Sequence, residues 1–494
     1  MHETLLVRAD ASPRMGTGHV MRCLALAQAW QPREQVHFLS AEITSALEAR
    51  LTAEGFVSRS LAATPGSVDD AEVTIACARE HGAAWVVVDG YQFGADYQRL
   101  LMAAGFRILF LDDYGHAGEY EADLVLNQNL GADAALYVRR KPHTRLLLGP
   151  RYALLRREFQ AWRDWTREIP PVARKVLVTL GGGDPDNVTG KVVQALQGLD
   201  VECKVVVGGS NPNLEELKSA IGNRRSAMEL VVNAANMSEL MAWADMAIAA
   251  GGSTAWELAF MGLPSLVLVL AENQLKVAEA LAASNVARRA GTGAAAPGDL
   301  SADLHELLND RLGRARMSRL GRTMVDGKGG ERVVGELTGA AMTLRPAEPK
   351  DCRQVWEWAN DPEVRAVSFN TEPIPWESHT RWFEARRSDP DCVFLIADNS
   401  SGAPIGQVRF DLNNAEAVIS VSVDRRARGR GFGSELIRRA SQRLHEERQV
   451  CVIHAFTKPE NAASIRAFER AGYRKVGSTQ VGAHPAIELI QRLP

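Results

Sequence analysis

The sequence predicts an α/β protein made of two consecutive doubly wound, Rossmann-like halves, followed by a third unit of α+β type. Short apolar runs alternate with amphipathic stretches over the first 340 residues, as expected for parallel strands buried on both faces. A segment rich in Arg, Trp and Pro, residues 149–171, interrupts this alternation once. From Thr343 onward a new order begins, with antiparallel strands and then a helix after a Gly-rich turn.

The composition is that of an ordinary globular protein. The 494 residues exceed what one hydrophobic core holds, and length alone suggests about three units. With a net charge of −3, neither nucleic acid nor an acidic membrane is expected as the main partner. Residues 1–8 are interpreted as a first strand instead of a signal peptide, and no apolar run is long enough for a bilayer, so a cytoplasmic protein is expected. The six cysteines are scattered without zinc-binding spacing, so no metal is expected. The oligomeric state stays open.

Three domains are expected, with boundaries 1–150, 151–340 and 341–494. The strands expected in the first half are Leu5–Val7, Val36–Leu39, Trp85–Asp89, Ile108–Asp112, Leu124–Asn127 and Leu146–Leu148. Those expected in the second half are Lys175–Leu180, Lys204–Val207, Leu230–Asn233, Met246–Ala250 and Ser265–Leu270. The third unit is expected to contain strands Val393–Ala397, Ile405–Phe410, Val418–Val423 and Cys451–Phe456, the helix Glu435–Leu444, and a final helix. Ligands of open parallel sheets bind at the carboxyl ends of strands, so the cleft between the first two halves is the expected site.

A loop rich in glycine, which ends in histidine, follows the first strand and leads into an amphipathic helix. Gly16 and Gly18 let the backbone approach a ligand closely, and His19 begins the helix, where backbone amides favour anions. A histidine at that position can accept a proton from water in the cleft. The alternative is that the glycines only make a turn and His19 caps the helix.

The longer string around this loop, Arg8 to Ala27, resembles the start of the UDP-sugar hydrolases of pseudaminic acid biosynthesis, which act on UDP-2,4-diacetamido-2,4,6-trideoxy-β-L-altropyranose. Further matching segments, up to about residue 335, are Asp89–Tyr91, Leu111–Asp113, Asn127–Asn129, Gly149–Arg156 and Gly181–Asn187. The resemblance implies a GT-B arrangement of the two halves, no metal, and inverting attack of water with release of UDP. It makes His19 the principal catalytic residue, with Asp10 and Tyr91 as further candidates. Either of these two could instead be a structural cap or a packed aromatic.

A second motif, Ala249 to Pro264, follows a strand and opens a helix in the second half. Gly251 and Gly252 allow close approach to a diphosphate, while Ser253 and Thr254 add hydroxyl and amide donors. Glu257, one turn later, can accept hydrogen bonds from a ribose. The motif resembles the donor-nucleotide signature of GT-B glycosyltransferases, and the resemblance implies that Asn273 and Gln274, after the next strand, face the sugar or phosphate. Backbone groups around Asn236 and Met237 are expected to hold the uracil. The predicted UDP-binding residues are Gly16, Gly18, Met237, Gly252, Ser253, Thr254, Glu257, Asn273 and Gln274. The alternative is an ordinary helix start with a solvent-facing glutamate.

The third unit contains a strand, a basic glycine loop and a helix, Val421 to Leu444. The pattern Arg426-x-x-Gly429-x-Gly431 and the later segment Asn461 to Tyr473 resemble the GNAT superfamily of acetyltransferases, in which this loop binds the pyrophosphate of acetyl-CoA. Acetyl-CoA is therefore the expected co-substrate. The residues expected to bind it are Val421, Val423, Arg428, Gly429, Arg430, Gly431, Phe432, Gly433, Ser434 and Asn461.

One position departs from the GNAT pattern. Many members place a tyrosine seven residues after the asparagine, where it protonates the leaving thiolate, but here that residue is Phe468. Ser464, one helical turn earlier, is the substitute candidate, with ordered water as the alternative. The base that deprotonates the acceptor amine is open between Glu416 and His454, and either residue could be purely structural.

The two resemblances together favour a bifunctional enzyme with a UDP-linked amino sugar and acetyl-CoA as partners. The third unit is expected to acetylate the 4-amino group of the sugar, and the first two halves to release UDP from the product. Two alternatives stay open: a GT-B glycosyltransferase that passes the sugar to an alcohol, and a UDP-sugar binding module that serves an acetyltransferase with another amine acceptor.

Overall fold

A computed structural model describes residues 4–12, 15–31, 35–181, 184–209, 211–222, 228–290, 297–338, 342–399, 402–428 and 432–493, without the side chains of 273 and 297–299. The chain divides into two compact units, His2–Val333 and Val334–Pro494. Each unit is described by itself below. In the described residues, no helix combines the length and the apolar character needed to cross a membrane.

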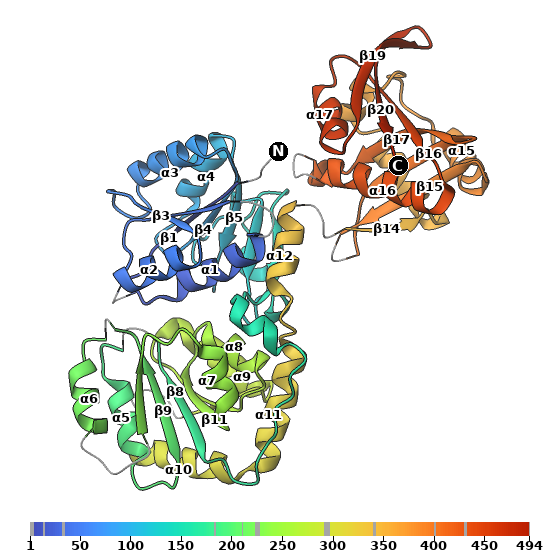
Figure 1. The fold of residues 1–494 in the computed structure, drawn as a ribbon. Helices are drawn as coiled ribbons and strands as arrows, with labels where there is room; N and C mark the ends of the chain where they lie inside the picture. Colours follow the sequence, from blue (N-terminus) through green and yellow to red (C-terminus); the bar gives the residue numbers. More distant parts are fainter. Residues whose placement is uncertain are drawn as a thin grey trace. The chain divides into compact units, whose positions relative to one another are not determined.

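The first half of the first unit is built on a parallel sheet with the order β3-β2-β1-β4-β5-β6-β7. Its strands are β1 (Thr4–Ala9), β2 (Val36–Ser40), β3 (Val57–Ser60), β4 (Ala83–Asp89), β5 (Arg107–Leu111), β6 (Leu124–Asn127) and β7 (Arg145–Leu148). The helices that cover it are α1 (Gly18–Trp30), α2 (Ser45–Ala53), α3 (Val68–Glu80) and α4 (Ala95–Ala103), and Figure 1 shows them on both faces. The central strands β1 and β4 are almost wholly buried, which explains their continuous apolar sequences.

The second half repeats this plan with the strand order β10-β9-β8-β11-β12-β13, again with parallel pairing. Its strands are β8 (Lys175–Thr179), β9 (Glu202–Val207), β10 (Met228–Val232), β11 (Met246–Ala250), β12 (Ser265–Leu268) and β13 (Arg288–Arg289). Its helices are α5 (Val188–Ala195), α6 (Leu214–Gly222), α7 (Met237–Trp243), α8 (Thr254–Phe260), α9 (Glu272–Ala283), α10 (Pro297–Asn309) and α11 (Arg311–Met324). Two separate apolar clusters, one on each face, confirm the doubly wound class.

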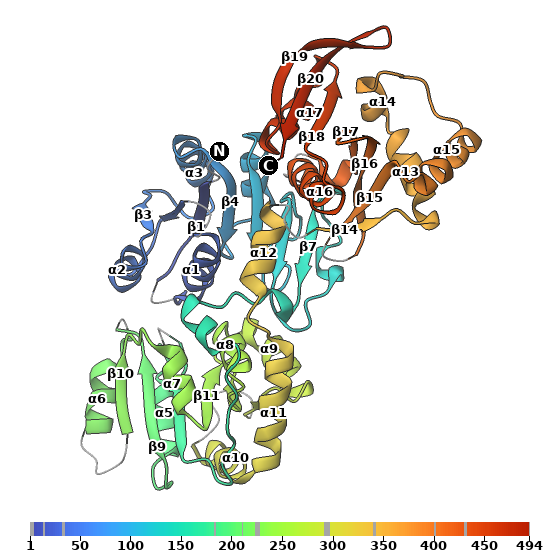
Figure 2. The ribbon, with the colours of Figure 1, turned by 45° about the vertical axis from the view of Figure 1, so that its right-hand side comes forward.

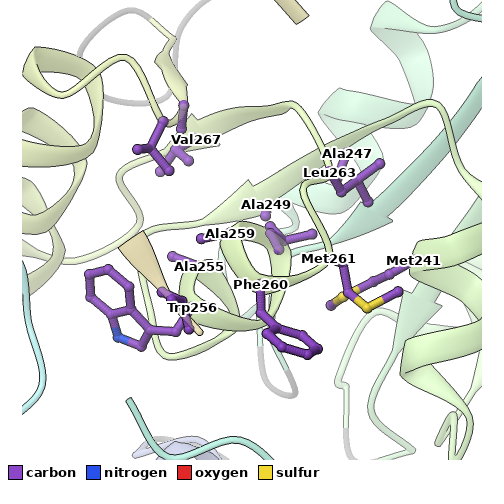
Figure 3. Packing of buried hydrophobic residues seen from close by; sticks show 14 of the residues in the cluster. Met241, Ala247, Ala249, Ala255, Trp256, Ala259, Phe260, Met261, Leu263 and Val267 are labelled. Carbon is purple, nitrogen blue, oxygen red and sulfur yellow. The ribbon is translucent and has the colours of Figure 1, made fainter. Parts of the chain in front are cut away.

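Helix α8 is fixed in the second half by large apolar side chains. Trp256 and Phe260 project from it into a cluster where each is 1% exposed (Figure 3). On its other side α11 approaches closely through Gly321, where a Cβ atom would lie 2.8 Å from the carbonyl oxygen of Ala259. The start of α8 therefore occupies a defined place at the carboxyl end of β11.

The connection between the halves consists of the short 3-10 helices η2 (Pro150–Tyr152) and η3 (Arg157–Trp162). The last helix of this region, α12 (Gly329–Thr338), returns to the first half. A Cβ at Gly329 would collide with the backbone of Tyr152 and Ala153, and one at Gly330 would lie 3.0 Å from the Cβ of Ala29 in α1. The two glycines thus allow α12 to pack closely on the connector and on α1.

The second unit contains one sheet with the order β14-β15-β16-β17-β18-β20-β19. Its strands are β14 (Thr343–Pro346), β15 (Cys392–Asp398), β16 (Pro404–Asn413), β17 (Glu416–Val423), β18 (Val452–Thr457), β19 (Arg474–Val481) and β20 (His484–Arg492). Its helices are α13 (Cys352–Ala359), α14 (Pro362–Val367), α15 (Trp376–Ser388), α16 (Phe432–Arg448) and α17 (Ala462–Arg470). Neighbouring strands pair antiparallel, except for the parallel pair β17 and β18. Figure 2 shows α16 and α17 on one face and α13 to α15 on the other, as the two apolar clusters also indicate.

The prediction for the last element of this unit was wrong. A final helix was expected to complete it, but the hairpin of β19 and β20 follows α17. In β20 the buried Ile487 and Leu489 alternate with the half-buried Glu488 and Ile490, which is the pattern of a strand covered on one face. β19 is the outer strand, largely exposed, and carries too few apolar residues to be recognised from its sequence.

Candidate active sites

A cavity of about 1880 Å³ in the first unit is lined by residues from both of its halves. It contains the predicted catalytic residues His19 and Tyr91. It also contains all the predicted UDP-binding residues whose side chains are described, namely Gly16, Gly18, Met237, Gly252, Ser253, Thr254, Glu257 and Gln274. Asn273 lies in the first turn of α9, and its side chain is outside the described part. The volume exceeds the roughly 300–1,000 Å³ of sites for drug-sized molecules, so the cavity has room for an extended ligand.

The two glycine loops meet across this cavity. A Cβ at Gly18 would lie 3.7 Å from the hydroxyl oxygen of Ser253, so the start of α1 faces the start of α8. Gly16 has a φ of +81°, which favours glycine. A Cβ at Gly251 would lie 3.2 Å from the Cβ of Gln274, whereas at Gly252 it would meet nothing within 4 Å. Gly251 therefore serves packing against α9, and Gly252 leaves backbone open towards the cavity.

The imidazole of His19 is held by a buried carboxylate. His19 is 7% exposed, and its Nδ1 lies 2.6 Å from Oδ1 of Asp89 at the carboxyl end of β4. His19 lies in the first turn of α1, and its contact is this carboxylate and not a helix cap. The interpretation of His19 as a cap is therefore wrong.

Arg22, one turn further along α1, binds the same carboxylate. Its Nε and Nη2 donate to the two oxygens of Asp89, each at 2.6 Å, and its Nη1 donates to Asp113 at 2.7 Å. Burial raises the pKa of both aspartates, but Arg22 outweighs burial and holds both pKa values below the ordinary range, with a contribution from His19. One guanidinium thus lies between two ionised carboxylates.

The distances around Nδ1 of His19 decide its tautomer. Nη2 of Arg22 lies 3.3 Å from this nitrogen, whereas the Asp89 oxygen lies 2.6 Å from it. The shorter contact is a charge-assisted hydrogen bond, and it requires a proton on Nδ1. Nε2 is then the ring nitrogen with a lone pair, which suits it to accept a proton.

Tyrosines form the wall beside His19. The Tyr91 ring meets the His19 ring edge-on at 4.9 Å between centroids, and the Tyr91 hydroxyl donates to Asp113 at 2.8 Å. Tyr114 lies 5.3 Å from Tyr91, ring to ring, and both are more than one third exposed. The pair offers an aromatic surface in the cavity next to the imidazole.

Asp10 lies elsewhere. It is fully buried, and its carboxylate accepts hydrogen bonds from Arg8, from Gln92 and from the backbone of Ala41 and Glu42. It is not among the residues that line the cavity. The structure does not bring Asp10 to the other candidates, because all its contacts serve the buried end of β1.

Glu257 lines the cavity and is paired with Arg156 of the connector. Nε of Arg156 donates to Oε1 of Glu257 at 3.0 Å, and its Nη2 forms an ion pair with the same oxygen at 2.9 Å. Burial raises the pKa of Glu257, although Arg156 acts in the opposite direction. Arg156 also contacts Glu158 at 3.0 Å, and Glu158 binds Arg50 of α2 at 2.9 Å. This chain of charges connects α8 with the first half.

In the second unit, β17 and β18 separate from one another part-way along. They pair over Glu416–Val418 and Val452–His454, and within these described strands the pairing ends there. Beyond the last pair, β17 continues to Val423 and β18 to Thr457. The two facing edges leave backbone N–H and C=O groups without partners in the other strand, which an amide-containing chain can use.

The residues predicted to bind acetyl-CoA fall only in part within the described residues. Gly429, Arg430 and Gly431 lie outside them. The remaining ones are Val421 and Val423 on β17, Arg428 after it, Phe432, Gly433 and Ser434 at the start of α16, and Asn461 before α17.

Three of these side chains have other contacts. Arg428 donates to Glu363 at 2.7 Å and to Asp361 at 3.2 Å. Phe432 is 1% exposed in the core, so only its backbone can contact a ligand. Asn461 caps α17 by accepting a hydrogen bond from the backbone N–H of Ser464 at 3.1 Å.

The candidate acid and bases of this unit fall into two places. Phe468 packs on Tyr473 at 5.1 Å between ring centroids, while Ser464, one turn earlier, is half-buried. His454 lies on β18, where its Nδ1 contacts Oε1 of Glu488 at 2.9 Å and its Nε2 lies 3.5 Å from Oε2 of Glu416. Glu416 and His454 are thus brought together, apart from the helix that carries Ser464.

Two family models match the chain: the glycosyltransferase family 28 C-terminal domain at residues 188–327, and the acetyltransferase (GNAT) domain at residues 341–474. The spore coat polysaccharide biosynthesis protein SpsG of Bacillus subtilis (strain 168) is 32% identical over 236 residues, which are 47% of this chain and 68% of that protein. The chain belongs to the SpsG family.

Two further relatives extend this assignment. The UDP-2,4-diacetamido-2,4,6-trideoxy-β-L-altropyranose hydrolase of Campylobacter jejuni is 24% identical over 239 residues, covering 48% of this chain and 81% of that protein. An uncharacterized protein of Methanocaldococcus jannaschii, MJ1062, is 22% identical over 511 residues, covering 95% of this chain and 96% of that protein. This SpsG-family chain therefore joins a UDP-sugar-hydrolase-like part to a C-terminal GNAT domain, and the resemblances drawn from the sequence are confirmed.

The sequence did not single out four residues that contact the candidate site residues of this SpsG-family chain: Arg22, Asp89, Asp113 and Arg156. All four lie in segments that resemble the hydrolases, and both aspartates stand at the carboxyl end of a parallel strand. That position, next to a histidine at a helix start, was the available signal for the two carboxylates. Arg156 had no such signal, because its partner Glu257 is 101 residues away.

Proposed function

We propose that the chain is a bifunctional enzyme of pseudaminic acid biosynthesis. Its first unit hydrolyses UDP-2,4-diacetamido-2,4,6-trideoxy-β-L-altropyranose to UDP and the free sugar. Its second unit uses acetyl-CoA to acetylate the 4-amino group of the precursor sugar nucleotide. The supporting observation is one cavity that is lined both by His19, which the buried Asp89 holds, and by the glycine loop before Glu257.

For hydrolysis, His19 acts as the general base. Its Nε2 takes a proton from a water molecule, the water oxygen bonds to the anomeric carbon, and the bond to the UDP oxygen breaks. Asp89 keeps the imidazole in the required tautomer and orientation, and the second carboxylate, Asp113, balances the positive charge that His19 gains. Tyr91 and Tyr114 supply the wall against which the sugar packs.

The nucleotide is held in the second half. Backbone amides around Gly252 and the hydroxyl groups of Ser253 and Thr254 bind the diphosphate, which is drawn to the start of α8. Oε1 of Glu257 is occupied by Arg156, so Oε2 is the oxygen available to a ribose hydroxyl. The loops face each other across Gly18 and Ser253, so the bond between sugar and diphosphate comes next to His19.

For acetyl transfer, the gap between β17 and β18 takes the amide-containing arm of acetyl-CoA. Backbone groups of Val421 and Val423 pair with its amides, and the loop before α16, with the amides of Gly433 and Ser434, binds the pyrophosphate. The two activities act in sequence, because the hydrolase substrate already carries the acetyl group that the second unit adds.

The test is to incubate the full chain with UDP-4-amino-4,6-dideoxy-N-acetyl-β-L-altrosamine and acetyl-CoA. We expect CoA to appear first, and UDP and the free diacetamido sugar after it. Each product is measured by chromatography and mass spectrometry. Appearance of UDP only after an alcohol acceptor is added would identify a glycosyltransferase instead. Appearance of CoA without any UDP would show that the first unit binds the sugar nucleotide without hydrolysing it.

A further inference from the structure

The closed end of the gap between β17 and β18 carries a histidine that the proposed acetyl transfer has not used. The pairing ends at Val418 and His454, and β17 continues beyond it to Val423, before the start of α16. A ligand anchored at the start of α16 therefore has its far end next to His454.

The length of β17 beyond the last pair matches the length of the acetyl-CoA arm. From Val418 to Val423 the strand advances five residues, which is about 17 Å. The extended arm between the pyrophosphate and the sulfur of acetyl-CoA contains about thirteen bonds and spans roughly 16 Å. The thioester then lies at the closed end, within reach of a side chain at position 454.

The side chain of His454 points to the face of the sheet opposite α16. In β17 and β18, Ala417, Ile419, Ile453 and Ala455 face the cluster beneath α16, so the alternate residues point to the opposite side. Val418, the direct neighbour of His454, is 41% exposed on that side. An acceptor amine can therefore approach the closed end of the gap over this face.

The two nitrogens of His454 are in different situations. Nδ1 lies 2.9 Å from Oε1 of Glu488 on the neighbouring strand β20, which fixes the ring and places the proton on Nδ1. Nε2 is shielded from solvent but makes no hydrogen bond among the described residues, and the nearest carboxylate, Glu416, is 3.5 Å away. A buried nitrogen with a lone pair and no donor requires an explanation.

We propose that His454 is the general base of the acetyl transfer, oriented by Glu488, and that Glu416 draws the acceptor in as an ammonium group. The inference rests on the proposed acetyltransferase function. Glu416 is 58% exposed on its side chain, so it can turn from Nε2 towards an incoming cation and leave that nitrogen accessible. The site takes a primary amine on a sugar ring, with a negative carboxylate on each side of the imidazole.

The ammonium gives one proton to Nε2 of His454, which passes it to solvent. The nitrogen lone pair then attacks the acetyl carbonyl, a C–N bond forms, and the C–S bond breaks. The second N–H proton ends on the sulfur, so the products are the amide, CoA thiol and one released proton.

The main test uses His454→Gln in the full chain, with the UDP-linked 4-amino sugar and acetyl-CoA. We expect kcat for CoA release to fall about 10²–10⁴-fold at neutral pH, because general base catalysis is typically worth that much. The dissociation constant for acetyl-CoA, measured by calorimetry, should stay within threefold of the wild-type value. Activity of the variant should rise at alkaline pH, where the substrate amine loses its proton without help, whereas wild type should already be active at lower pH. Glu416 and Glu488 are the charged groups that contact His454 in the described chain.

A rescue experiment separates catalysis from structure. Added imidazole should restore part of kcat to His454→Gly, and should leave the matched control His484→Gln unchanged, since His484 is exposed at the β19–β20 hairpin. A His454→Gln protein with full kcat, or one with weakened acetyl-CoA binding and an unaltered pH profile, would overturn the base assignment.

A second measurement does not depend on the acceptor. The imidazole ¹H–¹⁵N signal of His454, assigned by its loss in His454→Gln, should shift with acetyl-CoA and stay in place with 3′,5′-ADP, which lacks the arm. An unmoved signal with acetyl-CoA contradicts the inference. If wild type transfers no acetyl group to the sugar nucleotide while this shift occurs, the proposed acceptor is wrong and the placement of His454 stands.

Discussion

At His19 the chemistry depends on which ring nitrogen is occupied. Asp89 is buried, ionised and bonded to Nδ1, so the free lone pair lies on Nε2. Arg22 forms ion pairs with both Asp89 and Asp113. One positive charge thus faces two negative charges, and the cluster has a net charge of minus one when His19 is neutral. That excess charge lies next to the imidazole that takes the proton in the proposed mechanism.

Replacement of His19 by Asn should separate binding from hydrolysis. UDP affinity should remain within about threefold, while kcat for UDP release should fall about 10²–10⁴-fold, the usual contribution of a general base. The measurement is UDP release from the diacetamido sugar nucleotide, with titration calorimetry for UDP. His305→Asn, an exposed histidine on α10, is the matched control. Unchanged kcat in His19→Asn contradicts the assignment.

Replacement of Asp10 by Asn should affect stability and not catalysis. Its partner Arg8 is fully buried and also binds Asp70, so loss of one carboxylate leaves part of a buried guanidinium without its counter-charge. Breaking such a buried pair costs about 3–5 kcal/mol. We expect a lower free energy of unfolding in urea, with kcat per folded molecule unchanged. A large loss of kcat at full stability would return Asp10 to the catalytic candidates.

The two aspartates bound by Arg22 make stability depend on pH at the acid end. Their pKa values are lower in the folded chain than in the unfolded chain, so each contributes stability above the unfolded pKa of about 3.9. That contribution is lost as the pH falls through the lower folded values. Urea unfolding from pH 7 to pH 3 should show a decrease that starts near pH 4, and Asp113→Asn should show a shallower one. Equal slopes for the two proteins would contradict this origin.

Among the elements, the buried parallel strands were predictable because both their faces are apolar. β4, β6 and β11 lie within a residue or two of their expected bounds. β3 and β13 were not predicted, because the first is exposed and polar and the second has two residues, both arginine. The β19–β20 hairpin was missed for the related reason that its outer strand is largely exposed.

The packing of helix α8 on α11 can be tested by a substitution. Helix α8 carries Glu257 and depends on the close approach of α11 at Gly321, where an added Cβ would lie 2.8 Å from a carbonyl oxygen. Gly321→Ala should therefore displace α8 and lower the stability by about 1–3 kcal/mol, as overpacking typically does. We expect a raised KM for the sugar nucleotide with a smaller change in kcat. The control is Gly222→Ala, because a Cβ at Gly222 would meet no atom within 4 Å. Gly313→Ala is unsuitable, because a Cβ at Gly313 would collide with the side chain of Asp310.

At the scale of the whole chain, the candidate site was only partly predictable. His19 and Glu257 could be found from local motifs, since each follows a glycine loop at a helix start. The partners Asp89 and Arg156 depend on the strand order and on the path of the connector, which local patterns do not contain. The same holds for Glu488, which reaches His454 only through the unpredicted strand β20.

Variants with one damaged unit should complement each other. His19→Asn should convert the 4-amino substrate to the diacetamido sugar nucleotide and stop there, whereas His454→Gln should hydrolyse that nucleotide when it is supplied. Equimolar mixing of the two proteins should restore formation of free sugar, because the intermediate can diffuse between molecules. The measurement is a chromatographic time course, with each variant alone as the control. No free sugar from the mixture would contradict two separable activities.

The meeting of Gly18 and Ser253 has a consequence for turnover. In the proposed function a diphosphate between the two loops contacts both halves of the first unit, so we expect its release to require that the halves separate. We therefore expect product release, and not bond cleavage, to limit turnover, as it does in many enzymes whose domains close on the substrate. A bulkier residue at position 18 would keep the two loops apart. The nucleotide should then bind with lower affinity and dissociate faster.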